Sequence, residues 1–332
     1  MGQQLLAKNK WATDVSNGQS GYLDVESKDL SEKDLQGANF QGKDLSGFNF
    51  SGAKLKGASF FNANLTCALF MDAELQGADF TGACLDGAHL ERIKAANASF
   101  GMASLKKATL FGANLHHASF SKADLSDGDL RCTDMSGTRL REANLERADF
   151  TETNLKGADL SKCNVQGAYF TNADMRNTRL RQVKGFKEAN WIGTDLRNIN
   201  FAGAYLLHRF AVDQNYIYEF KESGRLARFL YYLWLISSDC GRSMSRWCLW
   251  IVVQIFFFAW LYSVVGVDYG PHPTVISDLY LSVVTLTTLG FGDVVPQNVA
   301  GQLIVMCEVV TGYMMLGGLL SIFSNKMARR GE

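Results

Sequence analysis

The stretch GADFTGACLDGAHL, residues 77–90, places a large apolar side chain at every fifth position, namely Phe80, Leu85 and Leu90. A small residue stands two positions before each of them. The same pattern runs from Leu30 to Leu180, and only Ala95 breaks the series of large residues. A period of five fits neither an α-helix nor a flat strand. It predicts a solenoid that turns a corner every five residues, with the large and the small residue both pointing inward.

The distribution of phenylalanine predicts how many five-residue units make one coil. Phenylalanine occupies nine of the sixteen large positions whose numbers are divisible by ten and none of the fifteen between them. Phe60, Phe80 and Phe100 are therefore expected to stack at a spacing of twenty residues, which is four units per coil. After Leu180 the register shifts by one residue, and we interpret the shift as a bulge within 181–186. The pattern then continues to residue 206, which gives about nine coils and a length of roughly 43 Å.

These units resemble the pentapeptide-repeat family, whose motif is A-[DN]-L-x-x. The resemblance covers residues 30–206 and implies a right-handed four-sided β-helix, with residues 1–29 as an N-terminal cap. Some members of that family imitate DNA with an acidic surface, but here 21 Lys and Arg residues balance 20 Asp and Glu residues. We therefore expect an assembly scaffold or a gating and regulatory module, open to an unknown cytosolic ligand or protein.

The overall composition excludes several other classes of function. The chain has 33 basic and 33 acidic residues, so a nucleic-acid partner is not expected. Its seven cysteines form no CxxC pair, which favours reduced thiols and argues against a zinc site. We find no nucleophile and base set, so the chain is not expected to be an enzyme or to hold a cofactor.

Two apolar segments predict membrane-spanning helices, at 247–267 and 299–325, within a pore domain at 246–330. The first has 21 residues, about 31 Å as a helix, which matches the apolar core of a bilayer. Residues 207–245 before it are expected to form a linker with amphipathic helices that lie at the membrane interface or between subunits.

The charges around these segments predict their orientation. Arginine residues precede the first segment, and lysine and arginine residues follow the second. The loop between them contains three aspartates and no lysine or arginine. The positive-inside rule then places both termini and the β-helix in the cytoplasm, with the chain crossing the cell (inner) membrane of a prokaryote twice.

The loop contains a polar segment, TLTTLGFGDVVP at 285–296, between the two apolar helices. Irregular backbone at membrane depth is tolerated only where it is buried in protein or lines water. We expect a short re-entrant helix at 274–287, whose carbonyl end favours a cation. The glycines at 290 and 292 allow successive carbonyls to turn toward one axis, where they replace the hydration shell of a cation.

At these residues the chain resembles the two-transmembrane potassium channels. TTLGFGD, residues 287–293, is similar to their signature T-T-V-G-Y-G-D, with Leu for Val and Phe for Tyr. The resemblance implies a homotetramer, because one loop cannot surround an ion. It also implies a selectivity filter at 288–292, with K⁺ as the permeant ion. The residues expected to bind K⁺ through their carbonyl oxygens are Thr288, Leu289, Gly290 and Phe291, with Gly292 closing the filter.

The resemblance also implies residues that support the filter, among them Thr287 and Asp293. In related channels a glutamate of the pore helix pairs with the filter aspartate, but Val284 stands at that position here. We expect Tyr280 to donate a hydrogen bond to Asp293 instead. Tyr280→Phe should then shorten the open lifetime of the filter in single-channel records, and an unchanged record would reject the pairing.

Two residues of the second spanning segment are candidates for gating. Gly312 lies where related channels place a hinge glycine, although it could equally allow close packing of helices. Glu308 is an ionisable group inside a membrane segment, which is costly unless it has a partner. We expect it to bind the back of the pore helix as a neutral acid, or else to face the cavity and attract cations.

The sequence thus favours passive potassium-selective conduction through a homotetrameric pore in a lipid bilayer. A non-selective cation channel is the first alternative, and a membrane-anchored interaction module is the second. No helix repeats arginine every third residue, so a voltage sensor is not expected. Since the printed sequence ends eight residues after Ser324, we also expect no carboxy-terminal regulatory domain.

Overall fold

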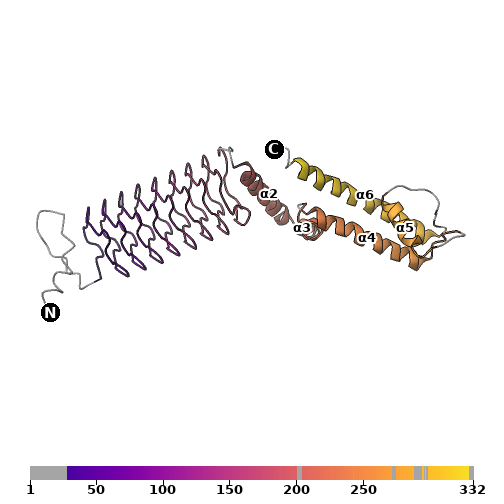
Figure 1. The fold of residues 1–332 in the computed structure, drawn as a ribbon, viewed down its shortest axis with the longest axis horizontal. Helices are drawn as coiled ribbons and strands as arrows, with labels where there is room; N and C mark the ends of the chain where they lie inside the picture. The colour runs from indigo at the N-terminus through magenta and orange to yellow at the C-terminus, as the bar shows by residue number, and fades with distance from the viewer. Residues whose placement is uncertain are drawn as a thin grey trace, which may run out of the picture. The chain divides into compact units, whose positions relative to one another are not determined.

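The computed structural model describes residues 28–199, 204–241, 243–270, 274–287, 294, 296 and 298–328. The chain divides into two compact units, Met1–Tyr218 and Glu219–Glu332. Figure 1 shows a series of stacked coils in the first unit and a group of helices in the second.

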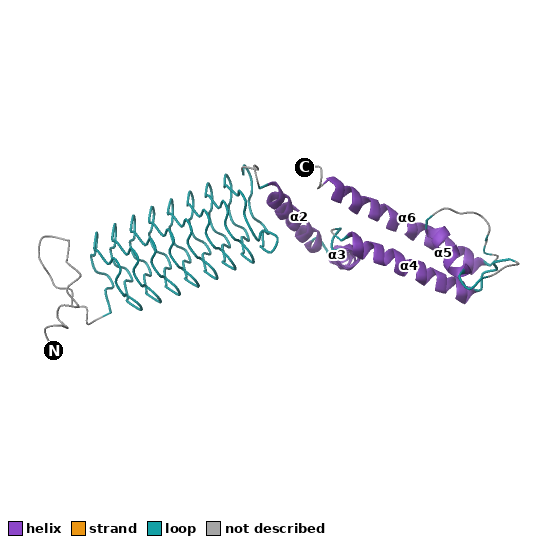
Figure 2. Ribbon diagram, viewed as in Figure 1, coloured by secondary structure: helices purple, strands orange, loops and turns teal. Residues whose placement is uncertain are grey.

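The first unit is a β-helix built from single-residue bridges and turns (Figure 2). Parallel bridges join residues twenty apart, such as Asp79 to Ser99, and four bridge positions recur in every coil. Each large residue bonds to the next coil, as where Phe80 N–H donates to the Ser99 carbonyl at 2.7 Å. The four-unit coil predicted from the phenylalanine spacing is therefore confirmed.

The core of this β-helix consists of the large and small residues of each unit. Phe60, Phe80 and Phe100 are fully buried, and their rings stack with centroids 4.7 and 4.8 Å apart. Ala78 and Ala83 are 1% exposed. Because the interior of a coil is narrow, one large and one small side chain per unit fill it at normal packing density.

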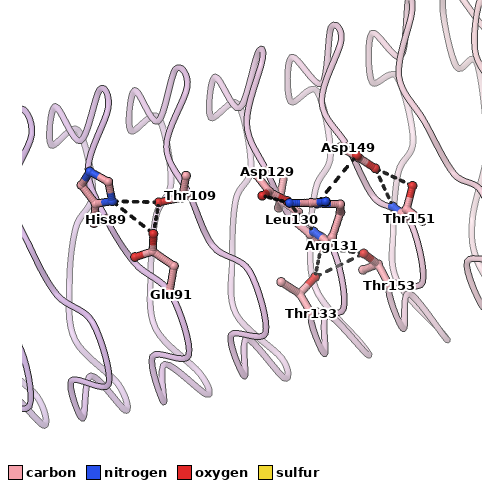
Figure 3. A network of polar contacts seen from close by, with 10 residues as sticks. All are labelled: His89, Glu91, Thr109, Asp129, Leu130, Arg131, Thr133, Asp149, Thr151 and Thr153. Atoms are coloured by element: carbon pink, nitrogen blue, oxygen red, sulfur yellow. Dashed lines mark hydrogen bonds and ion pairs between the residues drawn. The ribbon is translucent and has the colours of Figure 1, made fainter.

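Threonine replaces the small residue in several units without leaving a buried hydroxyl unsatisfied. Thr133 and Thr153 both donate to the carbonyl of Leu130 at 2.7 Å. On the outside of these coils, Arg131 bonds to Asp129 at 2.8 Å and lies 3.9 Å from Asp149 (Figure 3). The polar groups of these units are therefore paired both inside the coils and on their surface.

The shift of register predicted after Leu180 is present in the structure. Asn164 bridges to Lys184, twenty residues on, whereas Tyr169 bridges to Asn190, twenty-one residues on. The extra residue lies in a turn that contains Gly185, whose φ of 70° is in the left-handed region. One inserted residue thus enlarges a corner and leaves the stacking of the following coil intact.

The last coil is closed by α2, Tyr205–Glu222. Gln214 accepts the Trp191 N–H at 2.7 Å, and Asn215 accepts the Gly193 N–H at 2.7 Å. Leu207 and Ala211 of the same helix belong to the core of the β-helix. The sequence placed these residues in a linker that began at 207. Instead, the first part of α2 satisfies the edge of the solenoid, where unpaired backbone groups would otherwise invite association with other edges.

The second unit contains four further elements: α3 (Arg225–Ser238), α4 (Met244–Val265), α5 (Ser277–Leu286) and α6 (Val299–Ala328). α4 and the 299–324 part of α6 are long and apolar enough to cross a membrane, with mean hydropathies of 2.2 and 1.9. α4 begins three residues before the expected start at 247, because the Ser243 side chain caps it by accepting the Arg246 N–H. α5 is shorter at both ends than the expected 274–287.

Candidate ion pathway

The centre of the second unit is α5, a short apolar helix that packs against both α4 and α6. Its 10 residues extend about 15 Å, which is too short to cross a bilayer. Five of them are buried: Leu281, Ser282, Val284, Thr285 and Leu286. A half-length helix that returns between two spanning helices has the geometry expected of a re-entrant pore helix.

The chain leaves α5 at Thr287, which ends the helix. Its N–H donates to the Val283 carbonyl at 3.0 Å, and its Oγ1 donates to the same carbonyl at 2.7 Å. The expected filter at 288–292 and Asp293 follow directly and lie outside the described residues. Their positions as K⁺ ligands and filter support therefore stay predictions from the sequence.

A buried carboxyl group joins α5 to both spanning helices. Glu308 of α6 is 0% exposed. Its Oε1 lies 2.5 Å from the Ser282 hydroxyl of α5, and its Oε2 accepts the Tyr262 hydroxyl of α4 at 2.5 Å. Glu308 thus makes the expected hydrogen bond to the pore helix. Because the Glu308 side chain of α6 bonds to both α4 and α5, it links the three helices at this level.

One turn further along α6, the backbones of two helices meet. A Cβ atom added to Gly312 would lie 2.8 Å from the carbonyl oxygen of Leu286. Real Cβ atoms do not approach a backbone atom so closely, so glycine is required for this contact between α6 and the last turn of α5. Close packing of α6 against α5 therefore explains why glycine stands at position 312.

Two further polar contacts tie α6 to α4. The Gln254 amide donates to the Thr311 hydroxyl at 2.6 Å, and the Trp247 indole donates to the Met315 carbonyl at 2.7 Å. The indole also lies where a side chain at position 318 would project, since a Cβ on Gly318 would come 2.3 Å from its ring. Hydrogen bonds of this kind replace the hydrophobic driving force that helices lack inside lipid.

The start of α5 is held from the loop that precedes it. The Tyr269 hydroxyl donates to Asp278 at 2.5 Å. Burial, followed by this hydrogen bond and the negative charge of Asp278, raises the pKa of Tyr269, so its hydroxyl stays a donor. Asp278 lies in the first turn of α5, where the helix dipole favours a negative charge.

Two other predicted support residues also lie on α5. Val284 is buried, with 7% of its surface exposed, so the position of the glutamate of related channels is apolar here. Tyr280 is 40% exposed, and its expected partner Asp293 lies outside the described residues. The pairing of Tyr280 with Asp293 stays a prediction.

Ser282 and Tyr262 were not predicted from the sequence. The available signal was a serine in an otherwise apolar part of α5 and a tyrosine inside α4. An unsatisfied polar group inside a membrane segment costs free energy. Each of these hydroxyls could therefore have been assigned to Glu308 as a candidate partner.

Comparison with known proteins agrees with this division of the chain. Residues 250–329 match the profile of the ion channel family, and eight copies of the pentapeptide repeat match between residues 29 and 184. Trypsin-treated QnrB1, a plasmid-mediated fluoroquinolone resistance protein, is a solved structure with 19% identity and a TM-score of 0.45. The match covers 54% of this chain and 97% of that one.

Two relatives are similar to part of the chain. Two-pore potassium channel 1 of Arabidopsis thaliana is 28% identical over 97 residues, which are 29% of this chain and 27% of that protein. The chain thus spans about a quarter of the length of this relative. Protein LctB of Bacillus caldotenax is 32% identical over 101 residues, covering 25% of this chain and 75% of LctB. The chain therefore belongs to the ion channel family through its helical domain, to which a domain of pentapeptide repeats is joined.

Proposed function

We propose that the protein is a potassium-selective channel that conducts passively through a homotetrameric pore. The proposal rests on the short helix α5, which packs against two helices of spanning length and is followed, after Thr287, by the sequence TLGFG. Each chain supplies one such loop, so four copies of residues 288–292 would surround a K⁺ ion with carbonyl oxygens.

The potassium specificity is supported by sequence similarity. The sequence TTLGFGD is similar to the signature of potassium channels, and the relative from Arabidopsis thaliana is named as a potassium channel. Both support the proposal that the pore prefers K⁺ to other cations. The absence of Lys and Arg between Trp247 and Asn325 leaves the loop acidic, which attracts cations to the pore.

The β-helix is proposed to lie in the cytoplasm and to act as an assembly scaffold or a regulatory module. Its core is complete within one chain, and ion pairs such as Arg131 with Asp129 and Arg147 with Asp127 lie on its surface. The positive-inside rule assigns both termini to the cytoplasmic side of the cell (inner) membrane.

Purified full-length protein in a planar bilayer with unequal KCl and NaCl concentrations tests the proposal. A reversal potential that follows the K⁺ gradient is expected, together with a mass of four chains in detergent. Equal permeability of K⁺ and Na⁺ would identify a non-selective cation channel instead. No current at any voltage or pH would favour a membrane-anchored interaction module.

A further inference from the structure

If Glu308 is ionised, the three oxygen–oxygen contacts around it share only two hydroxyl hydrogens, those of Tyr262 and Ser282. The Ser282 Oγ lies 2.9 Å from the carbonyl oxygen of Ile255 and 2.5 Å from Oε1 of Glu308. A serine hydroxyl has a single hydrogen, and a backbone carbonyl only accepts. If Ser282 gave that hydrogen to Glu308, its contact with the Ile255 oxygen would have no hydrogen at all.

A protonated Glu308 resolves this shortage. The Tyr262 hydroxyl already donates to Oε2 of Glu308. If Oε1 carries a proton, Glu308 donates to Ser282, and Ser282 is free to donate to the Ile255 carbonyl. In this series of hydrogen bonds from Tyr262 to the Ile255 carbonyl, each hydroxyl hydrogen makes one hydrogen bond. Each oxygen–oxygen contact then has one hydrogen between its two atoms.

The charges nearby also favour a neutral carboxyl group. Glu308 is 0% exposed, and the sequence has no Lys or Arg between Trp247 and Asn325. Neighbouring copies of the same segment would supply none either. Of the nearby titratable groups, Tyr262 bonds to Glu308 itself, while Tyr269 and Asp278 bond to each other. A buried carboxylate without a cation is costly in a low-dielectric site, whereas a carboxylic acid with hydrogen-bonding partners is tolerated.

We propose that Glu308 is a positioning residue, a neutral carboxylic acid that donates its proton to Ser282 and so fixes the pore helix between α4 and α6. Ser282 lies five residues before Thr287, where the chain enters the predicted filter. A fixed pore helix keeps the filter entrance in register with the axis. The conduction readout of this inference rests on the proposed function, but its spectroscopic readout does not.

Infrared spectroscopy of the full-length protein in lipid tests the protonation directly. A carboxylic acid has a carbonyl stretching band that a carboxylate lacks. We expect this band in the wild-type protein and its loss in Glu308→Gln. Asp129→Asn is the matched control, because hydrogen bonding to Arg131 lowers the pKa of Asp129, so it contributes no such band. A wild-type spectrum in which Glu308→Gln removes nothing would overturn the proposal.

Rescue by the amide tests the positioning role. Glutamine has the shape of the acid, with an NH₂ group to donate to Ser282 and an oxygen to accept from Tyr262. We expect Glu308→Gln to keep the K⁺ flux within about twofold of the wild type, and Glu308→Met, which fills the space without hydrogen bonds, to lose about tenfold or more. Equal losses in both variants would contradict the role. If the wild-type protein shows the band but no flux, the proposed function fails and the protonation stands.

Discussion

Gly312 of α6 lies against the backbone of Leu286 at the end of α5, and a Cβ atom there would come within 2.8 Å of the Leu286 carbonyl oxygen and 3.2 Å of its Cα. Both neighbours are backbone atoms, so no side-chain rotation relieves the contact. Glycine at 312 therefore sets how closely α6 approaches the helix that leads into the predicted filter.

Gly312→Ala is expected to push α6 away from α5 and to destabilise the protein by about 1–3 kcal/mol, the usual cost of overpacking. The melting temperature of the purified protein and its K⁺ flux should both fall. Gly317→Ala is the control, because a Cβ there would meet nothing within 4 Å in the described structure of one chain. Equal melting temperatures for Gly312→Ala and wild type would show that α6 is not held at this contact.

Trp247→Phe should weaken the attachment of α6 to α4. The substitution keeps an aromatic ring but removes the indole N–H that donates to the Met315 carbonyl at 2.7 Å. The expected loss is about 0.5–1.5 kcal/mol in the free energy of unfolding. Trp250→Phe, at a position that is 41% exposed, serves as the control and should cost less. A larger effect at Trp250 would mean that the indole of Trp247 is not the anchor.

Phe100→Ala should destabilise the β-helix by about 3–5 kcal/mol, because it leaves a cavity between two stacked rings. Phe100 is 0% exposed, and its ring stacks on Phe80 and Phe120. Met102→Ala, in the next turn and at 62% exposure, is the control and should change stability little. Thermal denaturation followed by circular dichroism of the full chain measures both, and similar midpoints would contradict the stacked core.

Gln214→Met and Asn215→Leu should each expose the edge of the last coil. These amide side chains accept the N–H groups of Trp191 and Gly193, which would otherwise be unpaired. We expect faster aggregation of the variants in light scattering, since unpaired edges associate. Tyr216→Phe, at a position that is 62% exposed, should aggregate no faster than wild type. No difference among the three would show that α2 does not protect the edge.

Acid should weaken the β-helix through carboxylates paired with arginine. Hydrogen bonding to Arg176 is the main cause that lowers the pKa of Asp174 below its ordinary value of 3.8. A group whose folded pKa is lowered stabilises the fold above its unfolded pKa, and that contribution is lost as the pH falls toward the folded pKa. The melting temperature should therefore fall below about pH 4, with a smaller fall in Asp174→Asn. If the melting temperatures of the wild type and Asp174→Asn depend equally on pH, Asp174 does not contribute to the loss of stability in acid.

The β-helix could be predicted from the residue pattern alone. A five-residue period with a twenty-residue recurrence of phenylalanine allows only one way to bury the large residues, because each contact joins residues at a fixed distance along the chain. The spanning helices and the short helix between them were predictable for a similar reason, since lipid restricts backbone structure severely. The start of α4 differed by three residues because the Ser243 side chain caps it locally.

Tertiary structure alone decided which polar groups meet. Ser282, Tyr262 and Glu308 are 20 to 46 residues apart and share no repeat, so only the packing of three helices brings them within hydrogen-bonding distance. The same holds for α2, whose amides reach the edge of the last coil across 22 and 23 residues. Periodic contacts can be predicted from the sequence because they repeat at a fixed spacing. Single contacts between distant residues depend on how the helices pack, which no repeat in the sequence indicates.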